Sequence, residues 1–351
     1  MSSITKTLIT SISALSLMAT AASAKDYAQI DKIELDDFIA TVKIKTVKGD
    51  KTSVTITSGS KTQPIDITKK GTVLMIEGPG KPDPIKRRSW NFITTNGKVL
   101  RDDFRTYLAD YPTITIKVPA GMDVEFTDAI TILTAEDLGD LKMQGLVHVR
   151  ANIGDIDSGD VSLDGSGDIE VGHVAADLTA RLRGSGDLVF ASAATAELRL
   201  QGSGDIEIGD VAGAVTAELS GSGDIEVENI AGDAILSLRG SGDIETGEIT
   251  GDTEMAISGS GDIVVDKIDQ GASDVRVSGS GDILIKSGRA EAMRARVSGS
   301  GTIDFRGVAK DPDVSTSSSA GDIYIKDYEG TPKISGRGDI KVGNLRGKDY
   351  R

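Results

Sequence analysis

The chain has no cysteine among its 351 residues. Disulfide bonds, thiolate metal sites, a catalytic thiol and the lipid-modified cysteine of a bacterial lipoprotein are therefore excluded. Only two histidines occur, His148 and His173, and their separation in sequence leaves no obvious catalytic triad or histidine-rich metal centre. The stability of the fold must come from packing and hydrogen bonds.

Aromatic residues are also scarce, with 6 Phe, 6 Tyr and 1 Trp against 42 Gly. This ratio argues against an ordinary globular core. Basic residues are outnumbered, and the formal net charge of −15 argues against DNA, RNA and anionic lipid as partners. Cations, neutral glycans and proteins remain candidates.

Long apolar runs are confined to the start of the chain. Residues 1–24 hold one lysine, an apolar run and then Ala22-Ser23-Ala24, the small-x-small pattern that signal peptidase reads. The run contains several Ser and Thr and is shorter than the roughly 20 residues that span a bilayer. We therefore predict a signal peptide over 1–24, no membrane span, and export to the periplasm, the cell surface or the extracellular space.

What the sequence has in abundance is one motif, Gly-Ser-Gly-Asp followed by an aliphatic residue. Degraded copies, such as "GSGTI" at 299–303 and "GRGDI" at 336–340, extend the series. A fixed period of about 19 residues is typical of a solenoid. The aspartate of the complete motif recurs in steps of 18 to 20 residues, at Asp168, Asp187, Asp205, Asp224, Asp243, Asp262 and Asp282.

Apolar and polar residues alternate within each unit, and a period of two indicates strands. Two short strands per unit cannot bury their apolar side alone, but stacked units bury one continuous column. The sequence therefore predicts an all-β fold, a right-handed parallel β-helix with coils of about 19 residues. At its corners, glycine would adopt positive φ and aspartate would accept backbone hydrogen bonds. The inward side chains of one unit would be Val215, Ala217, Leu219, Ile225, Val227 and Ile230.

The chain divides into four segments by this pattern. Strand alternation without the motif, at 40–47, 53–57 and 72–77, indicates first turns or a β cap. We predict a signal peptide at 1–24, an N-terminal β region at 25–112, β-helix repeats at 113–345 and a C-terminal tail at 346–351.

Residues 81–112 break the strand pattern inside the N-terminal region. Leu100, Phe104, Tyr107 and Tyr111 fall at helical spacing. Three readings stay open for this insert: a short helix that caps the open end of the rod, a plain loop, or a partner site. We favour a cap or loop because exposed sheet ends must be covered. A partner site would be built on Trp90, Arg87 and Arg88.

The repeated "GSGDI" coils, preceded by "FIATVKIKTVKGDKTSVTIT" and "LMIEG", resemble a known family. It is the putative auto-transporter adhesin head domain, also called the GIN domain, of exported bacterial proteins. The likeness spans about 30 to 345. It implies a β-helical, cell-envelope or secreted protein with an adhesive role, and no catalytic residues. We expect no auto-transporter barrel, because the sequence ends within a few residues of the last coil.

The corner aspartates should stack in a row with one carboxylate per coil. Neighbours about 4.8 Å apart repel by roughly 1 kcal/mol in water, which backbone amides or a cation must offset. We favour backbone amides, because Asp and Gly already prefer turns. The alternative cofactor is Ca²⁺, held by a double ladder of oxygen ligands on one outward face. Its ligands would be Asp168, Asp205, Asp224, Asp243, Glu170, Glu207, Glu226 and Glu245.

Further along the chain, Val264, Leu284 and Tyr324 stand at the outward place that Glu occupies in earlier units. An exposed apolar strip can be a docking surface, although scattered apolar side chains are normal on surfaces. The "RGD" at 337–339 sits where the motif places Ser-Gly-Asp, so we interpret it as a degenerate repeat rather than as an integrin motif.

These features predict an exported, non-catalytic β-helix that presents a repetitive surface for adhesion or cell-envelope interaction, with a polysaccharide or an envelope protein as partner. One alternative is a calcium-stabilised extracellular scaffold. Another is a polysaccharide-active lyase or hydrolase, since carboxylates with Arg or Lys perform that chemistry. The even spacing of the carboxylates argues against an enzyme, because an active site should break the repeat locally.

Overall fold

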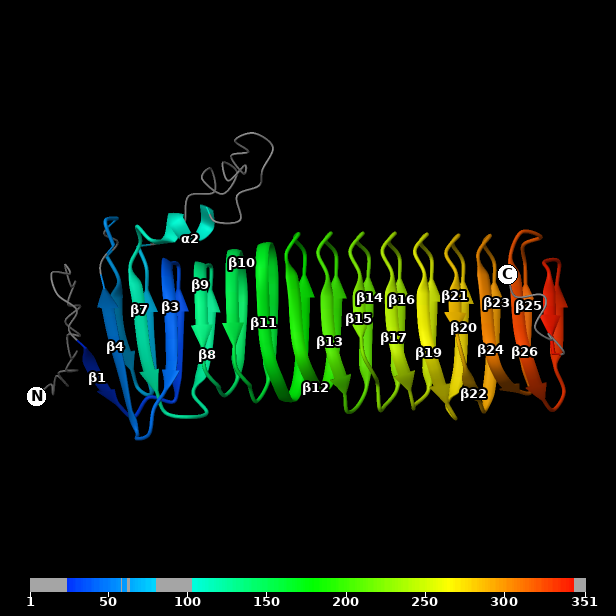
Figure 1. The fold of residues 1–351 in the computed structure, drawn as a ribbon, viewed down its shortest axis with the longest axis horizontal. Helices are drawn as coiled ribbons and strands as arrows, with labels where there is room; N and C mark the ends of the chain where they lie inside the picture. The colour runs from blue at the N-terminus through cyan, green and yellow to red at the C-terminus, as the bar shows by residue number, and fades with distance from the viewer. Residues whose placement is uncertain (1–23, 58, 62–63, 80–102, 344–351) are drawn as a thin grey trace, which may run out of the picture.

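The computed structural model describes residues 24–57, 59–61, 64–79 and 103–343, which form one elongated rod of stacked β coils (Figure 1). The predicted tail, and all of the predicted signal peptide except Ala24, lie outside the described residues. Within the described part, no helix combines the length and apolar composition needed to cross a bilayer.

The N-terminal end of the rod mixes parallel and antiparallel strands. β2 pairs in parallel with β6 and β8, and β3 with β7 and β9. In contrast, β4 runs antiparallel to both β1 and β7, and β5 runs antiparallel to β6. The antiparallel strands end the parallel stack. The strands predicted at 40–47, 53–57 and 72–77 are present as β3, β4 and β6. The elements are β1 Lys25–Ala28, β2 Lys32–Asp36, β3 Ile39–Thr46, β4 Lys51–Thr57, β5 Asp66–Lys70, β6 Val73–Glu77, α2 Asp103–Leu108, β7 Thr113–Val118, β8 Asp123–Thr127 and β9 Ile130–Ala135.

From β10 onward every strand pairing is parallel, which confirms the predicted parallel β-helix. Three long strands run through both faces of their coils: β10 Leu141–Ile153, β11 Gly159–Leu182 and β12 Asp187–Leu200. In later coils the motif separates two strands. The strands after it are β13 Ile206–Val211, β15 Ile225–Val227, β17 Ile244–Ile249, β19 Ile263–Asp269, β21 Ile283–Ile285, β24 Thr302–Lys310, β26 Asp322–Glu329 and β28 Ile340–Val342. The strands before it are β14 Val215–Leu219, β16 Ala234–Leu238, β18 Thr253–Ile257, β20 Ala272–Val277, β23 Ala292–Val297, β25 Asp313–Thr316 and β27 Lys333–Gly336. The short β22 Gly288–Ala290 pairs with β19 and β24.

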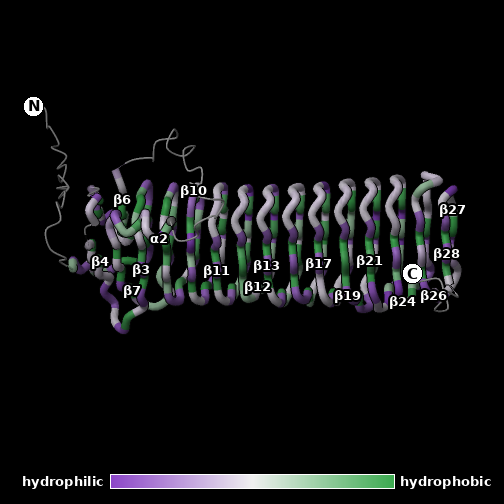
Figure 2. Tube along the Cα trace, turned by 45° about the horizontal axis from the view of Figure 1, so that its top comes forward, coloured by the Kyte–Doolittle hydropathy of each residue, from purple (hydrophilic) through white to green (hydrophobic). Residues whose placement is uncertain are grey.

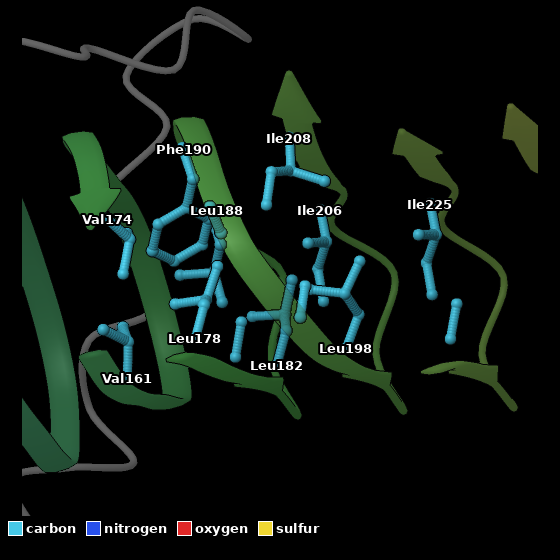
Figure 3. Packing of buried hydrophobic residues seen from close by; sticks show 14 of the residues in the cluster. Val161, Val174, Leu178, Leu182, Leu188, Phe190, Leu198, Ile206, Ile208 and Ile225 are labelled. Carbon is cyan, nitrogen blue, oxygen red and sulfur yellow. The ribbon is translucent and has the colours of Figure 1, made fainter. Parts of the chain in front are cut away.

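The core is a single apolar column inside the coils, and hydrophobic and hydrophilic positions alternate along the chain that surrounds it (Figure 2). All six inward residues predicted for the unit around Asp224 are buried, which confirms the period-two pattern. Figure 3 shows how side chains from successive coils stack, with Leu188, Ile206 and Ile225 in neighbouring layers. These three residues share one register position.

The helix predicted from the spacing of Phe104 and Tyr107 is present as α2. Phe104 and Leu108 pack with Ile130 of β9, and the Phe104 ring meets the His148 ring edge-on at 4.4 Å. α2 therefore lies on the side of the rod, against β3 and β9, and not over an end (Figure 1). The capping role is taken instead by the antiparallel strands, whose hydrogen bonds cover the sheet edge directly.

The motif glycines are required by close approach rather than by backbone conformation. In the seven complete motifs, all within the described residues, only Gly167 has a positive φ, of 130°. A Cβ added at Gly223 would overlap the carbonyl oxygen of Gly204 in the coil before, and Gly242 meets Gly223 in the same way. The predicted reason for glycine was therefore wrong at most corners, since stacking leaves no space for a side chain there.

Candidate binding surface

The corner aspartates are hydrogen-bonded from coil to coil, as the favoured prediction required. Oδ1 of Asp224 accepts a hydrogen bond from the backbone N–H of Asp243 at 2.8 Å, and Oδ1 of Asp243 accepts one from Asp262 at 2.7 Å. Each contact gives a backbone amide a charged acceptor and so offsets the repulsion between stacked carboxylates. Oδ1 accepts a backbone hydrogen bond from the next coil in the same way at Asp187, Asp205, Asp262 and Asp282.

The predicted calcium ligands are in register but are not gathered into a site. Glu207, Glu226 and Glu245 stack on neighbouring coils and are exposed. Glu170 is separated from this row by Val189, and its carboxylate accepts a hydrogen bond from Asn152. In the described part of the chain, none of the eight predicted ligands belongs to a group of three carboxylates close enough to share an ion. Calcium binding at this ladder stays a prediction.

A different acidic cluster, which the sequence pattern did not indicate, lies near the N-terminal end. Carboxylate oxygens of Asp36, Asp37 and Asp128 lie within 4.8 Å of one another, and Oδ1 of Asp37 is buried without a hydrogen-bond partner. Burial raises the pKa of the Asp36 carboxyl, and the charges of Asp37 and Asp128 raise it further. The parallel pairing of β2 with β8 brings these distant residues together. The sequence shows Asp36 and Asp37 as an adjacent pair, but it does not indicate that Asp128 lies beside them.

The predicted apolar strip is interrupted. Val264 and Leu284 are neighbours in register, but Asp304 stands between Leu284 and Tyr324 and binds Arg306 at 2.8 Å. The Tyr324 hydroxyl donates towards two carboxylates, at 3.3 and 3.4 Å. Burial and those carboxylates raise the pKa of Tyr324 to about 12. The other predicted partner residues, Trp90, Arg87 and Arg88, lie outside the described residues.

The two histidines lie in different coils, and each contacts a serine one coil later. His148 Nδ1 is 2.6 Å from Ser166 Oγ, and His173 Nδ1 is 2.7 Å from Ser192 Oγ. Burial lowers the pKa of the His148 imidazole, and the positive charge of Arg150 lowers it further. The two pairs repeat one contact between neighbouring coils.

The "RGD" segment is the corner of the last coil. The backbone N–H groups of Arg337 and Gly338 both donate to Thr316 Oγ1, at 3.0 and 2.8 Å. The N–H of Asp339 donates to Asp322 Oδ1 at 3.2 Å, which is the ladder contact of the complete motifs. This geometry supports the interpretation as a degenerate repeat.

A groove of about 490 Å³ crosses five coils beside the motif corners, from β16 to β25. Its floor follows the chain at Leu238, Ile257, Val277 and Val297, whose own side chains point into the core. None of the described residues that line it is acidic or aromatic. Its polar side chains are three arginines and six serines: Arg239, Arg276, Arg296, Ser237, Ser258, Ser278, Ser298, Ser315 and Ser317.

Two rows of outward side chains form the walls of this groove. In one row, Ala256, Arg276 and Arg296 are in register on β18, β20 and β23. In the other, Ser258 and Ser278 follow the last residue of their strands. Sequence reasoning missed the groove, although the repeated "RVSGS" at 276–280 and 296–300 was its visible signal.

The groove arginines have carboxylate neighbours on one side. Arg276 contacts Glu254 and Asp274 at 2.7 Å each, and Arg296 lies 3.9 Å from Asp313. These carboxylates stand two residues before the groove-lining row in their strands, and they are not part of the groove lining. The arginines are about half exposed, so their remaining N–H groups are open to solvent or a ligand.

Comparison with known families gives two matches along the chain. Residues 30–231, more than half of the chain, match the family Toastrack DUF4097. The chain belongs to this family. Residues 234–344 match the family described as putative auto-transporter adhesin, head GIN domain. The predicted resemblance to the GIN domain is confirmed for the C-terminal repeats, which include the groove. It does not extend over the predicted span of about 30 to 345, because residues 30–231 match the other family.

Two solved structures are similar to the chain. A putative adhesin from Bacteroides fragilis NCTC 9343 is 13% identical, with 93% of this chain and 98% of that chain covered and a TM-score of 0.24. A putative cell adhesion protein from Clostridium sporogenes ATCC 15579 is 12% identical, with 76% and 99% covered and a TM-score of 0.18. At such TM-scores the superpositions say nothing about function. Comparison with curated proteins gave no match.

Proposed function

We propose that this chain is an exported, non-catalytic adhesion or cell-envelope protein whose solenoid presents a periodic surface to a polysaccharide or a protein. The observation that carries the proposal is the regular stacking of outward side chains, because each coil repeats the same positions along one rod. The GIN-domain match over residues 234–344 supports an adhesive role. The leader pattern in residues 1–24 supports export.

The non-catalytic part of the proposal rests on how the carboxylates are used. From Asp187 to Asp282, Oδ1 of each motif aspartate accepts a backbone hydrogen bond, so the same contact accounts for residue after residue. A hydrolase or lyase needs carboxylates with different environments, one of them able to act as an acid. The uniform contacts along this rod favour a structural role for the aspartates.

The test is native electrophoresis of the purified chain through gels that contain envelope and extracellular polysaccharides, with calcium or with chelator. An acidic protein that binds none of the polymers serves as the mobility standard. Retardation with polymers of unchanged length is the expected result. Polymer shortening would overturn the non-catalytic role. If no polysaccharide retards the chain, the proposal holds only if the chain captures an envelope protein.

A further inference from the structure

We propose that the groove from β16 to β25 binds an acidic linear polysaccharide, one that carries carboxylate or sulfate groups along its length. The inference rests on the proposed function and names the ligand class and the site. It concerns three arginines, Arg239, Arg276 and Arg296, and the serines between them.

The charge of the groove differs from that of the whole protein. The chain has a formal net charge of −15, yet the groove lining contains three arginines and no carboxylate among the described residues. A guanidinium presents donors in a planar fork that matches a carboxylate or sulfate with two parallel hydrogen bonds. The local charge therefore favours an anion at a place where the rest of the surface repels one.

The direction of the groove favours a polymer over a small anion. It runs along the rod axis, across five coils that are stacked about 4.8 Å apart. Arg276 and Arg296 occupy the same register position on adjacent coils, so their guanidinium groups recur along this axis. Serine hydroxyls at 258, 278 and 298 line the opposite wall with the same repeat. A chain of sugars with acidic groups at intervals could contact both rows.

The residues of the lining also favour an acidic polysaccharide over other polymers. Proteins that bind single-stranded nucleic acid combine a positively charged groove with aromatic side chains on which bases stack, and the described lining has no aromatic residue. A neutral glycan would leave the arginines unused. An acidic glycan uses the arginines for its charged groups and the serines for its hydroxyls.

The ion pairs of Arg276 do not prevent this binding. Its contacts with Glu254 and Asp274 involve half-exposed or partly exposed side chains, and such surface pairs are weak. Arginine has five N–H donors, so a ligand can bind those that face the groove while the carboxylates keep the others. Arg239 lies at the first coil of the groove and is exposed.

The test compares three polymers with the same backbone: dextran, carboxymethyl-dextran and dextran sulfate. The purified chain is run through native gels at a series of polymer concentrations. We expect no retardation by dextran and retardation by one or both acidic forms, weakening as salt is raised. The stronger acidic form identifies whether carboxylate or sulfate is preferred.

The groove variant is Arg239→Ser combined with Arg296→Ser. Serine already stands at 258 and 315, the neighbouring positions of these rows, so the fold should tolerate both changes. We expect the half-retarding polymer concentration to rise about tenfold, as for the loss of two charged contacts. The matched control is Arg183→Ser with Arg199→Ser, which removes the same charge from earlier coils outside the groove. The control should bind like the unchanged chain.

Four results would overturn the inference. They are equal retardation by dextran, equal weakening in the groove and control variants, binding of a single-stranded oligonucleotide as tight as that of the acidic dextrans, and no binding of either acidic dextran. If neither acidic dextran binds but another polysaccharide or an envelope protein does, the proposed function stands and the role of the groove is rejected. Binding of no polymer and no envelope protein would remove both.

Discussion

Oδ1 of Asp205 accepts a hydrogen bond from the backbone N–H of Asp224, 2.8 Å away and one coil further along the rod. Asp224 holds Asp243 in the same way, and Asp243 holds Asp262. The side chain that defines the repeated motif therefore links each corner to the next. A row of carboxylates that should repel is stabilised because each member from Asp187 to Asp282 has a backbone donor.

Replacing Asp224 with Ala should destabilise the fold by about 1 kcal/mol, because the N–H of Asp243 loses its acceptor at an exposed corner where water can partly replace it. Asp224→Asn keeps an acceptor oxygen and should cost less. Urea unfolding followed by circular dichroism measures both. If Asn and Ala variants are equally destabilised, the hydrogen bond is not the reason for the aspartate.

Removal of divalent cations should leave the unfolding temperature of the chain unchanged, because the corner oxygens already have backbone donors. Thermal unfolding with added calcium and with chelator is the measurement. A clear rise with calcium would support the calcium ladder. Asp224→Asn should then reduce that rise.

Replacing Gly223 with Ala should destabilise the fold by about 2 kcal/mol, since the new methyl group would overlap the carbonyl oxygen of Gly204 and the coils would have to separate locally. The control is Ser222→Ala at the exposed centre of the same corner, which should change the unfolding free energy by less than about 0.5 kcal/mol. Equal stability of the two variants would contradict the close-approach explanation.

Truncation of two adjacent residues of β16 should destabilise the fold by very different amounts. Leu236 is fully buried and Ile235 is 45% exposed. Leu236→Ala should therefore cost about 2 to 5 kcal/mol through lost burial and the cavity that remains. Ile235→Ala should cost far less. Comparable losses in chemical unfolding would mean that the inward and outward faces are assigned wrongly.

Stability on the acid side should depend on Glu125. Burial raises the pKa of this carboxyl, but hydrogen bonds from Lys32 and Lys142, at 2.6 and 2.9 Å, outweigh it and leave the pKa below its ordinary value. As pH falls, the Glu125 carboxyl therefore binds a proton at a higher pH in the unfolded chain than in the folded chain. Stability from this site is present above the ordinary glutamate pKa of about 4.3 and is lost as pH falls through the lower folded value.

Unfolding free energy measured against pH tests this expectation. Glu125→Gln should lower stability near neutral pH by about 1 kcal/mol and should flatten the decline below pH 4.3 or so. Glu226→Gln removes an equal charge from an exposed side chain and controls for the change in net charge. An unchanged acid limb in the Glu125 variant would contradict the prediction.

Much of the fold followed from local patterns. Alternation along a strand decides which side chains face inward, so Ile225 and Val227 could be assigned to the core without coordinates. The spacing of Phe104 and Tyr107 indicated α2, but not where it would pack. Its docking against β3 and β9 depends on contacts between residues far apart in sequence, such as Phe104 with Ile130.

The candidate surfaces were harder to predict, because they depend on which residues become neighbours in the stack. The apolar strip is predicted from places after the motif aspartate, and the coil with the degraded motif "GSGTI" has no such aspartate. That coil supplies Asp304, which separates Leu284 from Tyr324. Arg276 and Arg296 likewise belong to strands before the motif, where alternation shows only that they point outward.

The period, the two faces of each strand and the single apolar column follow from the amino-acid sequence, because they depend only on neighbouring residues along the chain. The need for glycine at position 223, the contact of Asp36 with Asp128 and the groove beside Arg276 and Arg296 depend on how the coils stack. Those features arise between coils, where steps of 18, 19 or 20 residues shift the register and decide which side chains meet.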